Sequence, residues 1–308
     1  MAKMSQTVKD ILQIVVFLVV VAVLVISFVV YPLNRTKALM GRPDLEQYNP
    51  DSLAINDPAV FAEEGFAADS LHIEGDVNTR LACMMLRSPG NSAAGDTAVP
   101  KGLAIMLHGI NEDRTAWMPL AHAVVDAGLE VLMYDQRASG LTTGEYYGDG
   151  QLEAYDLQEV IAYLQLHNQL TRPLYIVGRD LGAEAALLTA RDESRIDAVV
   201  AVTPFLSTDR WIQALLDQHD AYWIPFRKTI MWFWYRLRSS YDTDSRDNSQ
   251  IEAVGCRTLM LLPNDARQDE EVAILTELSD PARLTVGDLP TDDAALTADI
   301  VAFLMTQQ

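Results

Sequence analysis

Residues 173–188 read Pro-Leu-Tyr-Ile-Val-Gly178-Arg179-Asp180-Leu181-Gly182-Ala-Glu-Ala-Ala-Leu-Leu. The short apolar run, the paired glycines and the alanine- and leucine-rich segment predict a buried strand, a tight turn and a helix. Asp180 stands at the centre of that turn, flanked by Gly178 and Gly182. The residues expected around this aspartate therefore bear most directly on what the protein can do.

The same alternation of apolar runs and amphipathic segments continues on both sides of this stretch. It indicates an α/β fold with a mostly parallel sheet covered by helices on both faces. Strands are expected at 70–75, 79–87, 103–107, 130–134, 174–177, 198–202, 258–262 and 283–286, and helices near 115–127, 151–168, 181–190, 268–279 and 292–305.

The N-terminal region contains an apolar run without charge at residues 11–31. About 20 such residues span a bilayer as a helix. A signal peptide usually has a shorter apolar core and a small-residue cleavage site, and neither is evident here. The sequence therefore predicts a tail at 1–10, a single transmembrane helix at 11–31, a juxtamembrane linker at 32–66 and one large domain at 67–308.

The side of the membrane is poorly specified. Lys3 and Lys9 precede the span, whereas Arg35, Lys37 and Arg42 follow it, so positive charge is nearly balanced. The extracytoplasmic side is slightly favoured for the domain.

Composition narrows the range of partners. A formal net charge of −20 argues against nucleic acid and against general adhesion to anionic lipid. Cys83 and Cys256 lack metal-ligand spacing and are expected to be buried thiols rather than a disulfide. No metal and no cofactor are expected.

Three motifs in order carry a resemblance: His108-Gly109 after a strand, then Asp135-Gln-Arg-Ala-Ser-Gly-Leu-Thr-Thr-Gly144, then the turn from Gly178 to Gly182. Together they resemble the α/β-hydrolase superfamily, and within it the membrane-anchored serine-aminopeptidase-like branch. The resemblance covers roughly residues 67–308. It implies an α/β-hydrolase fold with a helical cap after the sixth strand, at about 205–255.

The resemblance also implies positions for a catalytic site. The turn at Gly178–Gly182 matches the nucleophile elbow, and the backbone N–H groups of Ile110 and Leu181 match the oxyanion hole. His108 is expected to support its loop rather than to transfer protons.

The expected Ser-His-Asp triad is degenerate. Asp180 replaces the serine, and Pro290 stands where the histidine should follow the last strand. The acid slot falls at Ala266, with Asp265 one residue early as the possible acid. Serine attack needs a base, and neither serine nor base is in place.

Two interpretations of Asp180 follow. In the favoured one the site is non-catalytic, with the carboxylate capping the following helix and filling the oxyanion hole. The protein is then a binding or scaffold protein, or a subunit of a membrane assembly. In the alternative, Asp180 is a nucleophile acting on apolar esters, epoxides or halides, as the elbow aspartate does in haloalkane dehalogenases and epoxide hydrolases.

The interval between Pro204 and Cys256 is rich in aromatic residues. Trp223, Phe226, Trp232 and Trp234 lie near several arginines, a combination that suits a bilayer interface, although a cap helix packed on the core is slightly favoured. The partners expected are membrane lipid through residues 11–31, an apolar small ligand and a membrane protein.

Overall fold

The computed structural model describes residues 5–31, 33–34, 41, 66–76, 79–87, 99–206, 210–211, 229–230, 232–233, 254–263 and 282–306. The chain divides into two units. One comprises Met1–Met40 and Trp211–Thr243, and the other comprises Gly41–Arg210 and Asp244–Gln308.

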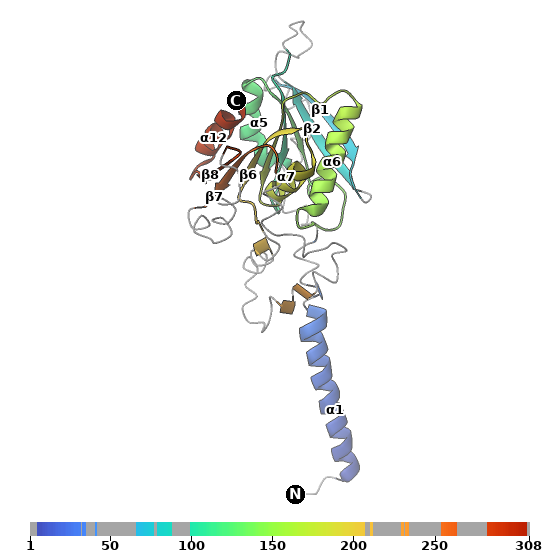
Figure 1. Ribbon diagram of the computed structural model, residues 1–308. Helices are drawn as coiled ribbons and strands as arrows, with labels where there is room; N and C mark the ends of the chain where they lie inside the picture. The colour runs from blue at the N-terminus through green and yellow to red at the C-terminus, as the bar shows by residue number, and fades with distance from the viewer. Residues whose placement is uncertain are drawn as a thin grey trace. The chain divides into compact units, whose positions relative to one another are not determined.

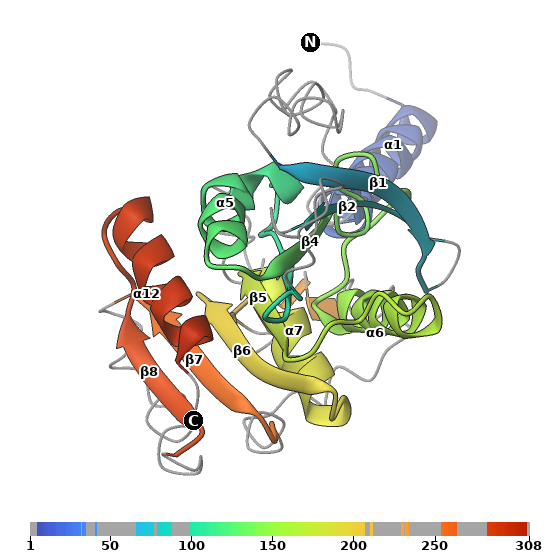
Figure 2. The same ribbon diagram turned by 90° about the horizontal axis from the view of Figure 1, so that it is seen from above.

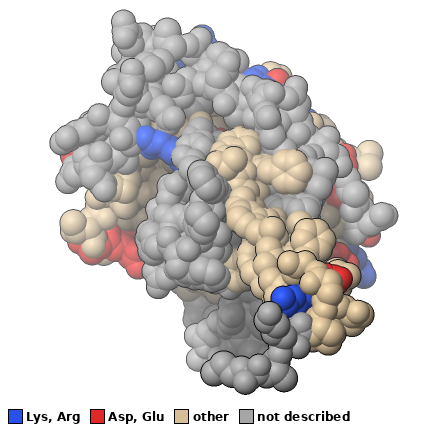
Figure 3. Space-filling model, turned by 90° about the horizontal axis from the view of Figure 1, so that it is seen from below, with Lys and Arg blue, Asp and Glu red and all other residues tan. Residues whose placement is uncertain are grey.

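The first unit contains a long apolar helix (Figure 1). Helix α1 spans Gln6–Val25 and continues as a π-helical turn, η1, over Ile26–Val30. Ser5 caps its start by accepting a hydrogen bond from the N–H of Val8. The charged residues of the helix are Lys9 and Asp10, near its start, and much of the described surface in Figure 3 is tan and uncharged. By length and composition it could cross a membrane, a property that signal sequences share.

The second unit is built on an eight-stranded sheet with the order β1-β2-β4-β3-β5-β6-β7-β8. Strand β2 is antiparallel to both of its neighbours, and the pairs from β4 through β8 are parallel. The strands are β1 Ala67–Glu74, β2 Arg80–Arg87, β3 Leu103–Leu107, β4 Glu130–Tyr134, β5 Leu174–Arg179, β6 Ile196–Val202, β7 Arg257–Leu262 and β8 Leu284–Asp288.

Helices cover both faces of this sheet (Figure 2). The helices are α5 Met118–Asp126, preceded by the 3₁₀ turn η4 Arg114–Trp117, then α6 Gln151–Leu166, α7 Leu181–Asp192 and α12 Asp293–Met305. One apolar core lies between the sheet and α6 and α7, and the other between the sheet and α5 and α12. Strands β3 and β4 are buried along their whole length, which explains why they read as unbroken apolar runs.

The α/β-hydrolase fold expected from the sequence is confirmed. Each predicted strand is present, with ends that differ by a few residues, as at β1, which starts at Ala67 rather than Ser70. The expected helix at 268–279 and most of the expected cap at 205–255 lie outside the described residues.

The direction in which successive strands are added to the sheet reverses beside β3. The chain moves from β3 to β4 on one side and later returns to place β5 on the other. In open α/β sheets the crevice at the carboxyl ends of such strands is the usual ligand site. His108 and Asp180 follow β3 and β5, at this edge.

Candidate functional site

Asp180 lies at the end of β5 and directly before α7, in a strained backbone conformation. Its φ is 49° and its ψ is −113°, a region that costs an L-residue about 1–3 kcal/mol. The glycines on either side make this turn tight. A Cβ on Gly182 would come within 2.6 Å of the carbonyl oxygen of Leu107, so the helix packs directly on β3.

Strain is concentrated at this edge of the sheet. Of the six non-glycine residues with positive φ in the described part of the chain, only Asn168 lies elsewhere, after α6. The other five follow the carboxyl ends of four strands: Asn111 after β3, Ala138 after β4, Asp180 after β5, and Thr203 and Leu206 after β6. Clustered strain of this kind is typical of functional sites. These five residues belong to the edge where the sheet reverses its order.

The carboxylate of Asp180 faces the neighbouring strands. Its Oδ1 accepts a hydrogen bond from the hydroxyl of Thr203 at 2.5 Å. Its Oδ2 lies 2.6 Å from the point where a Cβ on Gly109 would be, so a side chain there would require this carboxylate to move. Burial raises the pKa of Asp180, the Thr203 hydrogen bond lowers it, and the nearby charge of Glu112 raises it again.

The expected role of Asp180 as a helix cap is wrong. Its side chain accepts no hydrogen bond from the N–H groups of α7. The physical reason is its backbone, because a capping residue normally adopts extended φ and ψ angles rather than a positive φ.

Among the described residues, no hydrogen bond joins this carboxylate to the N–H groups expected to form the oxyanion hole. The N–H groups of Ile110 and Leu181 have no acceptor among the residues that the structure describes. Their side chains contribute to a small apolar cluster in which Leu181 packs with Ala138 and Tyr147, and Ile110 lies alongside. The two donors therefore lie beside a small, buried apolar cluster.

Glu112 is a residue of the site that the sequence did not reveal. Its Oε2 accepts a hydrogen bond from the N–H of Gly109 at 2.7 Å, and its Oε1 pairs with Nη1 of Arg179 at 3.2 Å. The guanidinium of Arg179 also lies 4.6 Å from the ring centre of Trp117. Glu112 thus connects the loop after β3 to the residue before the elbow.

His108 is enclosed by backbone. Its Nδ1 lies 2.8 Å from the carbonyl oxygen of Gly109, and its Nε2 accepts from the N–H of Gln136 at 2.9 Å. The side chain of Gln136 donates back to the carbonyl oxygen of His108. Both ring nitrogens are therefore occupied by hydrogen bonds. This buried histidine has no nitrogen left to accept a proton from a group at the elbow.

The turn after β8 contains no histidine. Asp288 ends the strand, the N–H of Leu289 donates to Leu262, and Pro290 follows. Of the other histidines, His72 lies on β1, His122 on α5 stacked against Phe66, and His167 at the end of α6. His219 and the possible acid Asp265 lie outside the described residues.

The Asp135–Gly144 motif is structural. Asp135 accepts from the N–H groups of Arg114 and Leu141 at 3.0 and 2.8 Å. Arg137 pairs with Asp156 of α6 at 2.8 Å, with both side chains almost fully buried. The motif holds the end of β4 to its neighbours and so fixes the edge on which the site is built.

Most of the aromatic residues expected at the cap cannot be placed. Trp223, Phe226 and Trp234 lie outside the described residues. Trp232 is helical and belongs to the first unit. In the part of the chain that the structure describes, no group of three His, Cys, Asp or Glu residues could hold a metal ion.

Comparisons with solved structures agree on the fold. An esterase of Pyrococcus furiosus matches with a TM-score of 0.62 at 16% identity, covering 86% of this chain and 97% of the esterase. Est1E of Butyrivibrio proteoclasticus, with bound ferulic acid, matches with a TM-score of 0.57 at 13% identity, covering 76% of this chain and 98% of the other. At such identities the likeness shows the fold alone.

A third structure, the α/β-hydrolase GrgF of Penicillium sp. sh18, has a TM-score of 0.56 at 17% identity, covering 77% of this chain and 95% of the other. No curated protein matches the chain. The family model described as serine aminopeptidase, S33, matches residues 98–262, which is more than half of the chain. The chain therefore belongs to the serine aminopeptidase S33 family of α/β-hydrolases.

Proposed function

We propose that this protein is a membrane-anchored α/β-hydrolase-fold protein that binds a ligand or partner and does not hydrolyse it. The observation that carries the proposal is that the described residues around the elbow offer no base. Asp180 replaces the serine, the turn after β8 holds Pro290 instead of histidine, and both ring nitrogens of His108 are bound to backbone. Acyl transfer needs a group that accepts the nucleophile's proton.

The apolar helix α1 supports the membrane anchor. The N–H groups of Ile110 and Leu181, next to the buried apolar cluster of Ala138, Tyr147 and Leu181, support our inference of a small, largely apolar ligand with a hydrogen-bond acceptor. A membrane protein is the further partner that we propose. The acidic net charge supports our inference that nucleic acid is not a partner.

Two observations favour a second candidate, in which Asp180 is a nucleophile. The elbow has its strained geometry, and the N–H groups of Ile110 and Leu181 remain available. A carboxylate oxygen would attack an alkyl carbon, form a C–O ester bond and release halide or an epoxide oxygen as the leaving group. Without a base to activate water, the alkyl ester would remain on the protein.

The two candidate functions predict different intact masses of the protein after incubation with reactive substrates. Full-length protein in detergent micelles is incubated with alkyl halides, epoxides and activated esters, with Asp180→Asn as the control. We expect no adduct and no turnover in either protein. An adduct that is lost in Asp180→Asn would establish the second candidate, and turnover that persists in Asp180→Asn would show an active site elsewhere; both contradict the proposal.

A further inference from the structure

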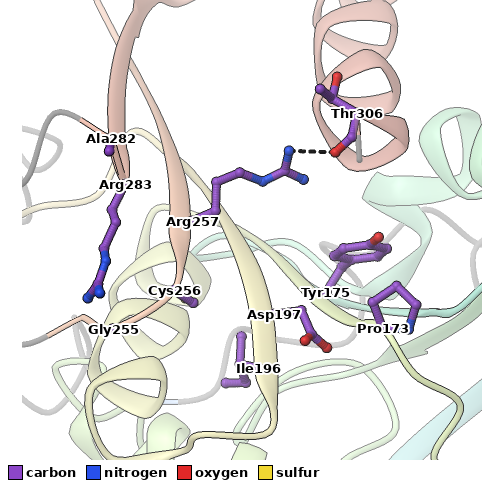
Figure 4. A pocket seen from close by; sticks show the side chains of 10 residues that line it. All are labelled: Pro173, Tyr175, Ile196, Asp197, Gly255, Cys256, Arg257, Ala282, Arg283 and Thr306. Carbon is purple, nitrogen blue, oxygen red and sulfur yellow. Dashed lines mark hydrogen bonds between the residues drawn. The ribbon is translucent and has the colours of Figure 1, made fainter. Parts of the chain in front are cut away.

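A second pocket lies at the opposite edge of the sheet, where β5 to β8 begin (Figure 4). Its volume is about 560 Å³, within the range of small-molecule sites. Polar side chains of Tyr175, Asp197, Cys256, Arg257 and Arg283 line it, together with Thr306 at the end of α12. The elbow residue Asp180 follows the other end of β5, so this pocket is separate from the site described above.

Arg257 is fixed in position before any ligand binds. Its Nη1 and Nη2 donate to the carbonyl oxygens of Thr306 and Phe303 at 2.6 and 2.9 Å. Its guanidinium also stacks on the Phe303 ring, 4.3 Å from the ring centre. These contacts use only part of the guanidinium, and the other N–H groups have no acceptor among the described residues. A preorganised fork of this kind suits a carboxylate or a phosphate.

Tyr175 supplies a second donor. The residue as a whole is 8% exposed, but its hydroxyl is not among the buried unpaired atoms, and it makes no hydrogen bond with any residue that the structure describes. Figure 4 shows its ring on the same side of the pocket as the Arg257 guanidinium, with Arg283 at the other margin. Burial raises the pKa of Tyr175, which keeps the hydroxyl protonated and able to donate. The hydroxyl is therefore a donor that a ligand oxygen in the pocket could accept from.

Arg257 brings a positive charge to the pocket, although the whole chain is acidic. The carboxylate of Asp197 is already neutralised by Arg172 at 2.6 Å and accepts the N–H of Leu174 at 2.7 Å. The positive charge of Arg257 therefore lies in the pocket without an ion pair to a lining carboxylate among the described residues. Positive charge together with fixed donors favours an anion.

We propose that this pocket binds a small organic molecule carrying a carboxylate or phosphate group, held by Arg257 and by the hydroxyl of Tyr175. The cavity is larger than a bare ion, so the remainder of the molecule would occupy the space toward Arg283. The proposal does not depend on whether the elbow is catalytic.

The test is calorimetric titration of full-length protein in micelles with inorganic phosphate and with acetate, against chloride at equal ionic strength. Phosphate or acetate is expected to bind, and the stronger of the two identifies the class of the group. Arg257→Lys, which keeps the charge and loses the fork, should weaken binding about tenfold. Tyr175→Phe should weaken binding about fivefold, as expected for the loss of one hydrogen bond.

Arg257 also holds the end of α12, so Tyr175→Phe is the decisive variant, because the Tyr175 hydroxyl has no partner among the described residues. Tyr155→Phe on the exposed face of α6 is the matched control and should bind as the wild type does. The proposal would be overturned if phosphate and acetate released no more heat of binding than chloride does. It would also be overturned if Tyr175→Phe bound the anion with the same affinity as the wild type.

Discussion

Full-length protein carrying Gly178→Ala will lose about 4 kcal/mol or more of its free energy of unfolding, or will fail to fold. A Cβ at this position would overlap the carbonyl group of Gly182 and lie 2.6 Å from the backbone nitrogen of Ala183. These are backbone atoms at the start of α7, so no side-chain rotation can relieve the clash. The measurement is urea unfolding in micelles followed by circular dichroism.

Gly255→Ala is the matched control for this prediction. A Cβ at Gly255 would meet nothing within 4 Å, so this variant should unfold within about 0.5 kcal/mol of wild type. If Gly178→Ala were as stable as Gly255→Ala, the close contact between the end of β5 and the start of α7 would be wrong.

Arg137→Met will destabilise the protein by about 3–5 kcal/mol, because it leaves the buried carboxylate of Asp156 without its cation. The side chains of Arg137 and Asp156 are 6% and 0% exposed, and Glu153 is fully buried nearby. Burial already raises the pKa of Asp156, which Arg137 counteracts. Without Arg137 the carboxyl should stay protonated to higher pH, so the deficit should shrink as the pH falls.

Arg191→Met is the control, because it removes an exposed ion pair and shows whether the loss of any ion pair lowers the free energy of unfolding as much. Arg191 and Asp192 are 35% and 53% exposed, and such pairs contribute about 0–1 kcal/mol. Equal losses in Arg191→Met and Arg137→Met, or a deficit in Arg137→Met that does not change with pH, would contradict the buried pairing.

Much of the fold could be predicted because its strands are buried on both faces. Strands β3 and β4 are unbroken apolar runs in the sequence, and their ends were predicted at Leu103–Leu107 and Glu130–Tyr134, as found. The edge strand β1 was less well defined, because only one of its residues is fully buried and its pattern is weaker.

The site was harder to predict because it depends on contacts between distant residues. Asp180 was identified as the elbow residue, but its partner Thr203 follows the next strand, and Arg179 meets Glu112 only because β3 and β5 pair. No local pattern marks Glu112 as part of the site. The pocket at the other edge is assembled from the starts of several strands and the end of α12, so no motif announces it.

The absence of a base at the elbow is tested most directly by placing a serine at the nucleophile position. Asp180→Ser in the full-length protein is treated with a fluorophosphonate, with an active serine hydrolase in the same reaction as a positive control. Thermal unfolding verifies that the variant is folded. We expect the variant to remain unlabelled while the control enzyme reacts, because a serine without a base is a poor nucleophile. Labelling of the folded Asp180→Ser variant at position 180 would show that a base is present at the elbow. That result would contradict the proposal that the site is non-catalytic.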